Sequence, residues 1–300
     1  MRVTVLAGGP SSEREVSLES GRAVAAGCER LGHDVLKADI TPDDLGALDR
    51  PCDLVFPVVH GTFGEDGELQ AILESRGMRY VGSDAAASRL GMDKHATKRR
   101  WHDAGLPTAR WACVARGDEP LVHAVAPPVV VKPACEGSSV GVVFCDTRED
   151  VDATVARLLK RFERVVIERR LVGRELTVGI LGQQVLPIVE VLPAEGFYDF
   201  EAKYRRDDTR YVVEPDIDRA TYQQIQELGV AAYRLLGCRH YGRVDLMLDE
   251  HDGPQLLEIN TVPGFTEHSL LPKAAAHVGI GFDELIERLL GLAMGEADEL

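Results

Sequence analysis

Two apolar segments near the C-terminal end, 241–248 and 255–260, constrain the fold of this chain more than any other stretch. Apolar and polar residues alternate in both, which is the period of a half-buried β-strand. The Asp-Gly-Pro sequence at 252–254 lies between them and is typical of a turn. The pattern therefore predicts two antiparallel strands joined by a short turn.

Polar side chains on one face of this hairpin predict a cation site. Asp245 falls opposite Glu258 in the expected pairing, and Arg243 falls opposite Asn260. Two directly opposed carboxylates repel each other, and a divalent cation between them would relieve that repulsion. Oxygen donors suit Mg²⁺ better than zinc. A solvated acidic face is the simpler alternative, but an amide and a guanidinium on the same face favour the cation.

Length and charge limit the class of protein. A chain of 300 residues exceeds one ordinary core, so we expect two or three domains. The net charge of −15 argues against a nucleic-acid surface. No apolar run approaches the roughly 18 residues of a membrane span, and the first strand follows directly on the first residues, without a secretory signal. The six cysteines are scattered without a CxxC pair, which predicts reduced thiols and a cytoplasmic protein.

The N-terminal part of the chain alternates strand and helix patterns. A buried strand at 3–7 ends in a Gly-Gly turn, and a helix follows as far as Leu31. Further strands are expected at 33–38 and 52–59. The alternation predicts a doubly wound α/β domain over 1–91. GxGxxG spacing is absent from the glycine turn, so a dinucleotide site is poorly supported.

Two polar residues of this domain fall where a ligand crevice is expected. Glu13 belongs to the start of the first helix, where it either complements the helix dipole or holds a substrate ammonium. His60 follows the strand at 52–59 and is either structural or catalytic. Ligands of open α/β sheets bind at the carboxyl ends of the strands. Both residues are therefore expected in one crevice.

The middle of the chain combines a lysine-bearing strand with a flexible flap. A strand at 129–133 carries Lys132, and small residues follow it at 134–141. Their amides and hydroxyls suit contacts with phosphates. The Walker order GxxxxGK[ST] is absent, so the segment is not a P-loop.

Backbone between Glu168 and Leu171 could pair with a purine edge. Helices are expected at 92–105 and 150–164, and two strands with a kink between them at 165–175.

An irregular stretch at 193–214 carries several aromatic residues among many charges. A structureless segment of this length is uncommon unless it is functional, for example as a lid. The alternative is a disordered surface loop, although the aromatic residues favour burial at some stage.

Helices are expected at 221–236 and 282–294, and Ser269 is a plausible N-cap of another helix. The N-terminus of that helix could bind a carboxylate.

With these residues assembled, the chain resembles the D-alanine–D-alanine ligases of the ATP-grasp fold nearly end to end. Seven motifs carry the likeness, in order: GGPSSEREVSLESG, HGTFGEDGELQ, GMDKHATK, VVVKPACEGSSVGV, FYDFEAKY, GRVDLM and LEINTVPGFTEHSLLPKAA. The resemblance implies an α/β (α+β) chain of three domains. These are a doubly wound domain over 1–91, a central domain over 92–171 and a C-terminal domain over 172–300, with the nucleotide between the last two.

The resemblance also implies a role for each candidate side chain. The residues implied to contact ATP are Lys94, Lys132, Ser139, Glu168, Leu171 and Glu175. The ligands implied for two Mg²⁺ (or Mn²⁺) ions are Asp245, Glu258 and Asn260. The catalytic residues implied are Glu13, Ser138, Tyr204, Arg243 and Gly264. The substrate-binding residues implied are His60, Lys203, Ser269 and Leu270. The need for a monovalent cation such as K⁺ is left open.

The implied activity is the ATP-dependent joining of two D-alanine molecules through D-alanyl phosphate, in a cytoplasmic homodimer that binds neither nucleic acid nor membrane. Tyr204 favours an amine acceptor, because relatives that make an ester tend to lack it. Cys135 and Val262 depart from the family pattern without affecting any implied role. Two alternatives are another carboxylate–amine ligase, making a D-alanyl ester or a different dipeptide, and a nucleotide-binding regulatory protein without turnover. The intact metal-ligand set argues against the second.

Overall fold

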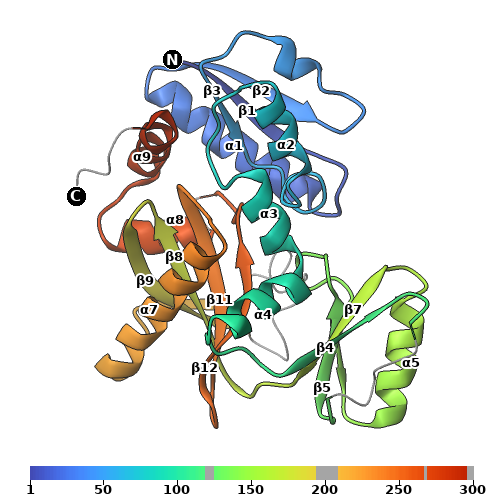
Figure 1. Cartoon of the computed structure of the whole chain (residues 1–300). Coiled ribbons are helices and arrows are strands. Elements are labelled where there is room, and N and C mark those ends of the chain that lie inside the picture. The colour runs from blue at the N-terminus through green and yellow to red at the C-terminus, as the bar shows by residue number, and fades with distance from the viewer. Residues whose placement is uncertain (119–124, 194–208, 267–268, 296–300) are drawn as a thin grey trace.

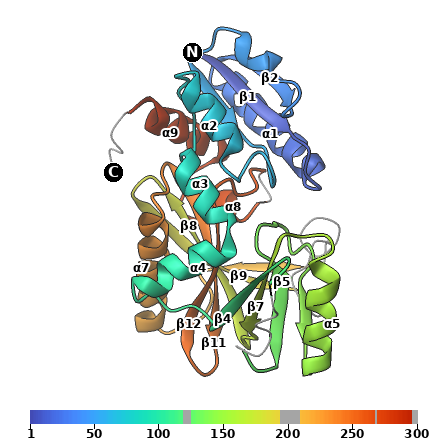
Figure 2. The same ribbon diagram turned by 45° about the vertical axis from the view of Figure 1, so that its right-hand side comes forward.

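The structure is a computed structural model that describes residues 1–118, 125–193, 209–266 and 269–295. Its strands form three sheets, of three, five and four strands. Figure 1 shows the three-stranded sheet at the top, the five-stranded sheet below it and the four-stranded sheet to the lower right. Figure 2 gives the same order from a second direction. The mixture of sheets and helices confirms the predicted α/β (α+β) class.

The N-terminal sheet is parallel, with β1 (Arg2–Gly8) between β2 (Asp34–Ile40) and β3 (Leu54–Pro57). Its apolar residues are buried because helices cover the sheet. Helix α1 (Arg14–Arg30) lies very close to β1, since a Cβ on Gly21 would stand 2.4 Å from the Ala7 Cβ. The remaining helices of this region are η1 (Gly46–Asp49), α2 (Glu68–Ser75) and α3 (Ala85–Met92).

The four-stranded sheet is antiparallel, in the order β4-β7-β5-β6. Helix α5 covers one face and spans Arg148–Leu158, so the predicted helix at 150–164 is wrong at its C-terminal end. Arg164 already begins β7, because Val165 and Ile167 bury their side chains in this sheet's core. The other elements are α4 (Lys94–Asp103), β4 (Trp111–Ala115), β5 (Val129–Pro133), β6 (Val143–Cys145) and β7 (Arg164–Arg169).

The five-stranded sheet has the order β10-β9-β8-β11-β12 and is antiparallel. Strand β10 (Arg210–Val213) lies within the stretch predicted to be irregular, and that prediction is therefore wrong for these residues. Pairing with β9 at the sheet edge makes β10 a strand, which the local sequence does not reveal. The other elements are β8 (Gly173–Leu181), β9 (Gln184–Leu192), α7 (Arg219–Leu235), β11 (Tyr241–Asp249), β12 (Gly253–Asn260), α8 (Leu270–His277) and α9 (Phe282–Met294).

The predicted hairpin is confirmed in its register. Asp245 pairs with Glu258, and Arg243 pairs with Asn260. The turn lies earlier than predicted, because the Gly-Pro dipeptide at 253–254 already belongs to β12. A register shift follows Asp245, where the pairing passes from Glu258 to Leu256 and Leu257 has no partner of its own on β11.

One apolar core joins the two ends of the chain. Residues of β1 and β3 share it with Phe265 and with the apolar faces of α8 and α9. Helix α9 therefore packs against the N-terminal region, as Figure 1 shows. No helix within the described ranges is long and apolar enough to cross a membrane. The predicted domain boundaries at 91 and 171 remain predictions.

Candidate active site

Two cavities meet at the hairpin of β11 and β12. The first, here the inter-sheet cavity, lies between the four- and five-stranded sheets. Its lining includes Lys94, Lys132, Ser139, Glu168, Leu171, Glu175, Asp245 and Glu258. The second, here the N-terminal cavity, lies between α1 and the loop after β12. Its lining includes Glu13, His60, Ser138, Arg243, Asn260, Gly264, Ser269 and Leu270. Lys203 and Tyr204 lie outside the described residues.

Protein cations neutralise the two carboxylates of the hairpin. The Arg243 guanidinium donates to both Asp245 oxygens, at 2.7 and 2.8 Å, and the Asn260 amide donates to one of them at 2.9 Å. The Glu258 carboxylate lies 3.3 Å from the Lys94 ammonium. The repulsion expected between these carboxylates is thus already relieved by neighbouring cations.

The same side chains form a fitting but incomplete oxygen site for a divalent cation. Asp245 and Glu258 supply carboxylate oxygens and Asn260 an amide group on one face. Among the described residues, no group of three or more His, Cys, Asp and Glu side chains could hold a metal. Mg²⁺ is usually bound by one or two carboxylates together with substrate phosphates. The donor set therefore fits a cation that arrives with a phosphate ligand.

A buried cluster of three charges underlies the inter-sheet cavity. The Glu168 carboxylate forms an ion pair with Lys132 and lies 2.9 Å from the ammonium of Lys98, which is fully buried. Lys98 also donates to the Thr108 hydroxyl at 2.7 Å. Burial by itself would raise the pKa of Glu168, but Lys132 and Lys98 outweigh it and hold this pKa at about 2. No sequence pattern singles out Lys98, although it lies one helical turn beyond Lys94 on α4.

The loop after β5 forms a flap that contacts the N-terminus of α1. Ser138 and Ser139 both have left-handed backbone, with φ of 48° and 59°, a conformation that is costly without glycine. The Ser138 hydroxyl donates to the Glu13 carboxylate. Glu13 occupies the N-cap position of α1 but makes no side-chain capping bond there. Its carboxylate faces the flap, and it does not serve as a cap.

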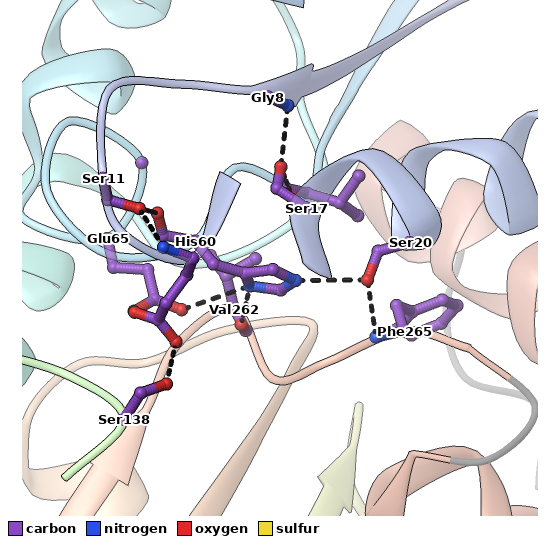
Figure 3. A network of polar contacts seen from close by, with 12 residues as sticks. Gly8, Ser11, Ser17, Ser20, His60, Glu65, Ser138, Val262 and Phe265 are labelled. Atoms are coloured by element: carbon purple, nitrogen blue, oxygen red, sulfur yellow. Dashed lines mark hydrogen bonds and ion pairs between the residues drawn. The ribbon is translucent and has the colours of Figure 1, made fainter. Parts of the chain in front are cut away.

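His60 belongs to a buried polar network between α1 and the loop after β12 (Figure 3). The ring Nδ1 lies 3.0 Å from the Val262 carbonyl, and the Nε2 lies 3.1 Å from the Ser20 hydroxyl. The Glu65 carboxylate lies 3.5 Å from Nδ1. Burial would lower the pKa of His60, but Glu65 outweighs it and the pKa is raised. Ser20 and Glu65 were both missed, although each lies inside a motif quoted above.

One local prediction needs correction. Ser269 is the N-cap residue of α8, but its side chain makes no capping bond. Its oxygen instead accepts from the Thr266 amide at 3.1 Å, because the preceding loop folds back on it. In the stretch 168–171, the amides of Arg169 and Arg170 donate to neighbouring carbonyls at 2.9 and 3.1 Å. The pairing of this stretch with a purine edge remains a prediction.

The fold and the site define a class of protein. Antiparallel sheets enclose the inter-sheet cavity, lysines lie on an adjacent strand and helix, and a flap contacts both cavities. This is the arrangement of the ATP-grasp ligases, whose nucleotide is held between two such sheets, and solved structures similar in fold agree with it.

Comparisons with known proteins identify the family within this class. The family models described as D-ala D-ala ligase N-terminus and C-terminus match residues 42–83 and 100–291. The D-alanine–D-alanine ligase of Alcanivorax borkumensis is 44% identical over 96% of this chain and 92% of its own length. That of Chromohalobacter salexigens is 42% identical over 98% and 95%. The chain belongs to the D-alanine–D-alanine ligase family and is an ATP-dependent ligase.

Solved structures support the same assignment. The D-alanine–D-alanine ligase from Bacillus anthracis superposes with a TM-score of 0.89 at 31% identity, covering 98% of both chains. The same ligase complexed with ATP gives a TM-score of 0.85 at 28% identity and the same coverage. VanG D-Ala:D-Ser ligase from Enterococcus faecalis gives 0.86 at 28% identity, covering 97% of this chain and 99% of its own.

Proposed function

We propose that this chain joins two D-alanine molecules with ATP, through D-alanyl phosphate, to give the dipeptide for peptidoglycan precursors. One observation carries the proposal: the inter-sheet cavity and the N-terminal cavity meet at the Arg243, Asp245 and Asn260 face of one hairpin. A phosphate donor in the first cavity and a carboxylate acceptor in the second would thus come together. This adjacency is what a phosphoryl transfer between two bound substrates needs.

The inter-sheet cavity suits ATP. Lys94 and Lys132 place ammonium groups where the phosphates would lie, and Ser139 covers them from the flap. Glu168, the Leu171 backbone and Glu175 also line this cavity and would hold adenine and ribose. The lysines would offset the repulsion between the phosphate and the attacking carboxylate and hold both in line.

Asp245, Glu258 and Asn260 would hold two Mg²⁺ or Mn²⁺ ions beside the phosphates. Divalent ions at this position supply charge neutralisation for the transferring phosphoryl group. The chain's own contribution is to orient the Asp245 carboxylate through hydrogen bonds from Arg243 and Asn260. The Lys94 ammonium, 3.3 Å from the Glu258 carboxylate, would orient that carboxylate in the same way.

The N-terminal cavity suits the amino acids. Glu13 would hold the ammonium of the first D-alanine, with Ser138 bound to its carboxylate. Arg243 and the Gly264 amide would stabilise the oxyanion that forms when the second amine attacks. Ser269, the Leu270 amide and Lys203 would bind the carboxylate of the second D-alanine, at the N-terminus of α8. Tyr204 would join the flap and Glu13 during this step.

The acceptor distinguishes this proposal from the closest alternative activities. A structural relative is a D-Ala:D-Ser ligase, so an amine acceptor other than D-alanine fits the same fold. Phosphate release with ATP and D-alanine tests the activity. Product analysis with equal D-alanine, D-serine and D-lactate tests the acceptor. We expect mostly D-alanyl-D-alanine, and a predominant ester or mixed dipeptide would overturn the substrate assignment. Absence of phosphate release would favour the regulatory alternative.

The assembly and location are also part of the proposal. The family resemblance supports a homodimer working in the cytoplasm, where the reduced cysteines of the chain are stable. Light scattering coupled to size-exclusion chromatography would distinguish a dimer from a monomer.

A further inference from the structure

We propose that Ser20 is a positioning residue that, together with His60, holds the Gly264 amide in place for oxyanion stabilisation. The inference rests on the proposed function, which gives the Gly264 amide that role. Ser20 lies on α1, in the N-terminal region, whereas Gly264 follows β12 at the other end of the chain. The link between them is a short chain of buried hydrogen bonds (Figure 3).

The hydrogen bonds hold the loop on both sides of Gly264. The Ser20 hydroxyl accepts from the Phe265 amide at 3.2 Å and contacts the His60 Nε2 at 3.1 Å. The His60 Nδ1 lies 3.0 Å from the Val262 carbonyl. A carbonyl can only accept, so Nδ1 carries a proton, and in the neutral ring Nε2 accepts from the Ser20 hydroxyl.

These contacts restrict the orientation of one peptide group in particular. A peptide bond is planar, so each bond fixes a whole plane. The Val262 carbonyl belongs to the plane before Pro263, and the Phe265 amide belongs to the plane after Gly264. The Gly264 N–H lies in the single plane between them. With both neighbouring planes held, the direction of this N–H is strongly restricted.

Apolar packing would not be enough to do this. The Phe265 ring is fully buried, with the rings of Phe56 and Tyr241 both at a centroid distance of 5.7 Å. Such packing anchors the side chain but is non-directional and does not orient a peptide plane. An amide that stabilises developing charge must point at the oxyanion, and a misplacement of about 1 Å can cost about 100-fold in rate. The hydrogen bond from the Phe265 amide to the Ser20 hydroxyl sets the orientation of the peptide plane, which the packing leaves undetermined.

Ser17 offers a matched control on the same helix. Both serines are fully buried, and each accepts from one backbone amide. Ser17 accepts from Gly8 at 2.8 Å and donates to the Val58 carbonyl at 2.7 Å, so its bonds remain within the N-terminal region. Ser17→Ala therefore removes a comparable buried hydroxyl without touching the loop around Gly264.

The experiment compares Ser20→Ala and Ser17→Ala with the unmodified protein in full-length form. We measure kcat for dipeptide synthesis, KM for ATP, and positional isotope exchange in labelled ATP with D-alanine. The exchange reports reversible phosphoryl transfer, which precedes the amine attack. Ser20→Ala should lower kcat about 10- to 100-fold and raise the ratio of exchange to dipeptide formation. KM for ATP should change less than about twofold, because the inter-sheet cavity is untouched.

The ratio is independent of how much protein is folded, since unfolded molecules contribute to neither rate. Ser17→Ala should leave this ratio unchanged, even if thermal unfolding shifts as much as in Ser20→Ala. Should the alanine variant not fold, Ser20→Cys keeps the side-chain volume, weakens both bonds and gives the same comparison. An unchanged ratio in the Ser20 variant, or equal ratios in the two variants, would overturn the inference. No phosphate release from the unmodified protein would overturn the proposed function itself, and this inference with it.

Discussion

At the scale of single residues, buried charge is concentrated under the inter-sheet cavity. Glu168 and Lys98 are almost completely inaccessible to water, and Lys132 is nearly so. Taking such charges out of water is costly unless they are paired. Their close pairing therefore keeps Glu168 ionised and fixes its direction toward the cavity. Lys98 makes this possible without itself lining the cavity.

The first prediction at this scale concerns acid stability. The pKa of Glu168 is held at about 2, below its ordinary 4.5, so its stabilising effect is complete above pH 4.5 and is lost as the pH falls toward 2. Lys98→Met removes one of the two cations and should move this loss to higher pH. Urea unfolding between pH 6 and 2 measures the shift. The exposed Lys160→Met serves as the control and should give an unshifted profile. Coinciding profiles of all three proteins would contradict the role of Lys98.

The second prediction concerns the hairpin carboxylates. Glu258→Gln should lower kcat by at least about 100-fold, since a carboxylate at the transferring phosphoryl group is lost. Stability should fall by about 3 kcal/mol at most, because the amide oxygen of the variant can still accept from the buried Lys94 ammonium. Steady-state rates at saturating Mg²⁺ and urea unfolding measure the two effects. Glu250→Gln, in the exposed turn of the same hairpin, should retain full activity. Full activity of the Glu258 variant would remove this residue from the site.

At the scale of elements, helix N-termini position the functional groups. Asp93 caps α4 by accepting from the amides of His95 and Ala96, both at 3.1 Å. It also accepts from Arg164 at 2.7 Å, which ties α4 to β7. Lys94 is the first residue of α4, and its amide donates to the Ala134 carbonyl at 2.9 Å. The cap therefore fixes a lysine of the inter-sheet cavity.

Replacing that cap should affect nucleotide binding as well as stability. Asp93→Ala should cost about 1–2 kcal/mol of stability and raise KM for ATP several-fold, with little change in KM for D-alanine. Asp218→Ala is a matched control, since Asp218 caps α7 through the Thr221 amide at 3.0 Å, away from both cavities. Denaturation and steady-state kinetics measure the pair. The interpretation fails if both variants lose stability alike and neither changes KM for ATP.

At the scale of the whole molecule, the N-terminal and C-terminal parts of the chain pack against each other. Helix α9 shares one apolar core with the strands of the N-terminal sheet, so the last helix supports the first sheet. The four-stranded sheet has a separate core with α5. The two ends of the chain therefore share a core to which the four-stranded sheet contributes no described residue.

This arrangement predicts which segments exchange their amide hydrogens faster when a core residue is replaced. Leu289→Ala, in α9, should cost about 2–5 kcal/mol and increase amide hydrogen exchange in α1 and β1, far away in sequence. Leu158→Ala, in α5, removes the same side chain from the other core and should increase exchange only between about residues 111 and 169. Hydrogen exchange monitored by mass spectrometry distinguishes them. Uniform increases across the chain in both variants would contradict two separate cores.

Local sequence was enough to predict the elements that carry the chemistry. Period-two alternation and a turn signal placed Asp245 opposite Glu258, and the structure has that register. The glycine turn, the lysine-bearing strand and the flap were also recognisable, because each motif lies in one short segment. Residue type and spacing singled out Glu13, Lys132 and Asp245 in this way, whereas the role of each candidate residue was implied by the family resemblance.

The tertiary structure decided which of these groups touch. Ser20 and Phe265 are 245 positions apart, and Lys98 meets Glu168 only when α4 packs under β7. Strand β10 forms because it pairs with β9 at the edge of the sheet. The Ser269 oxygen accepts from the Thr266 amide because the loop before α8 folds back on it. Sequence periodicity fixes how a segment folds by itself. Contacts between distant segments depend instead on how their buried faces pack, and no local pattern contains that information.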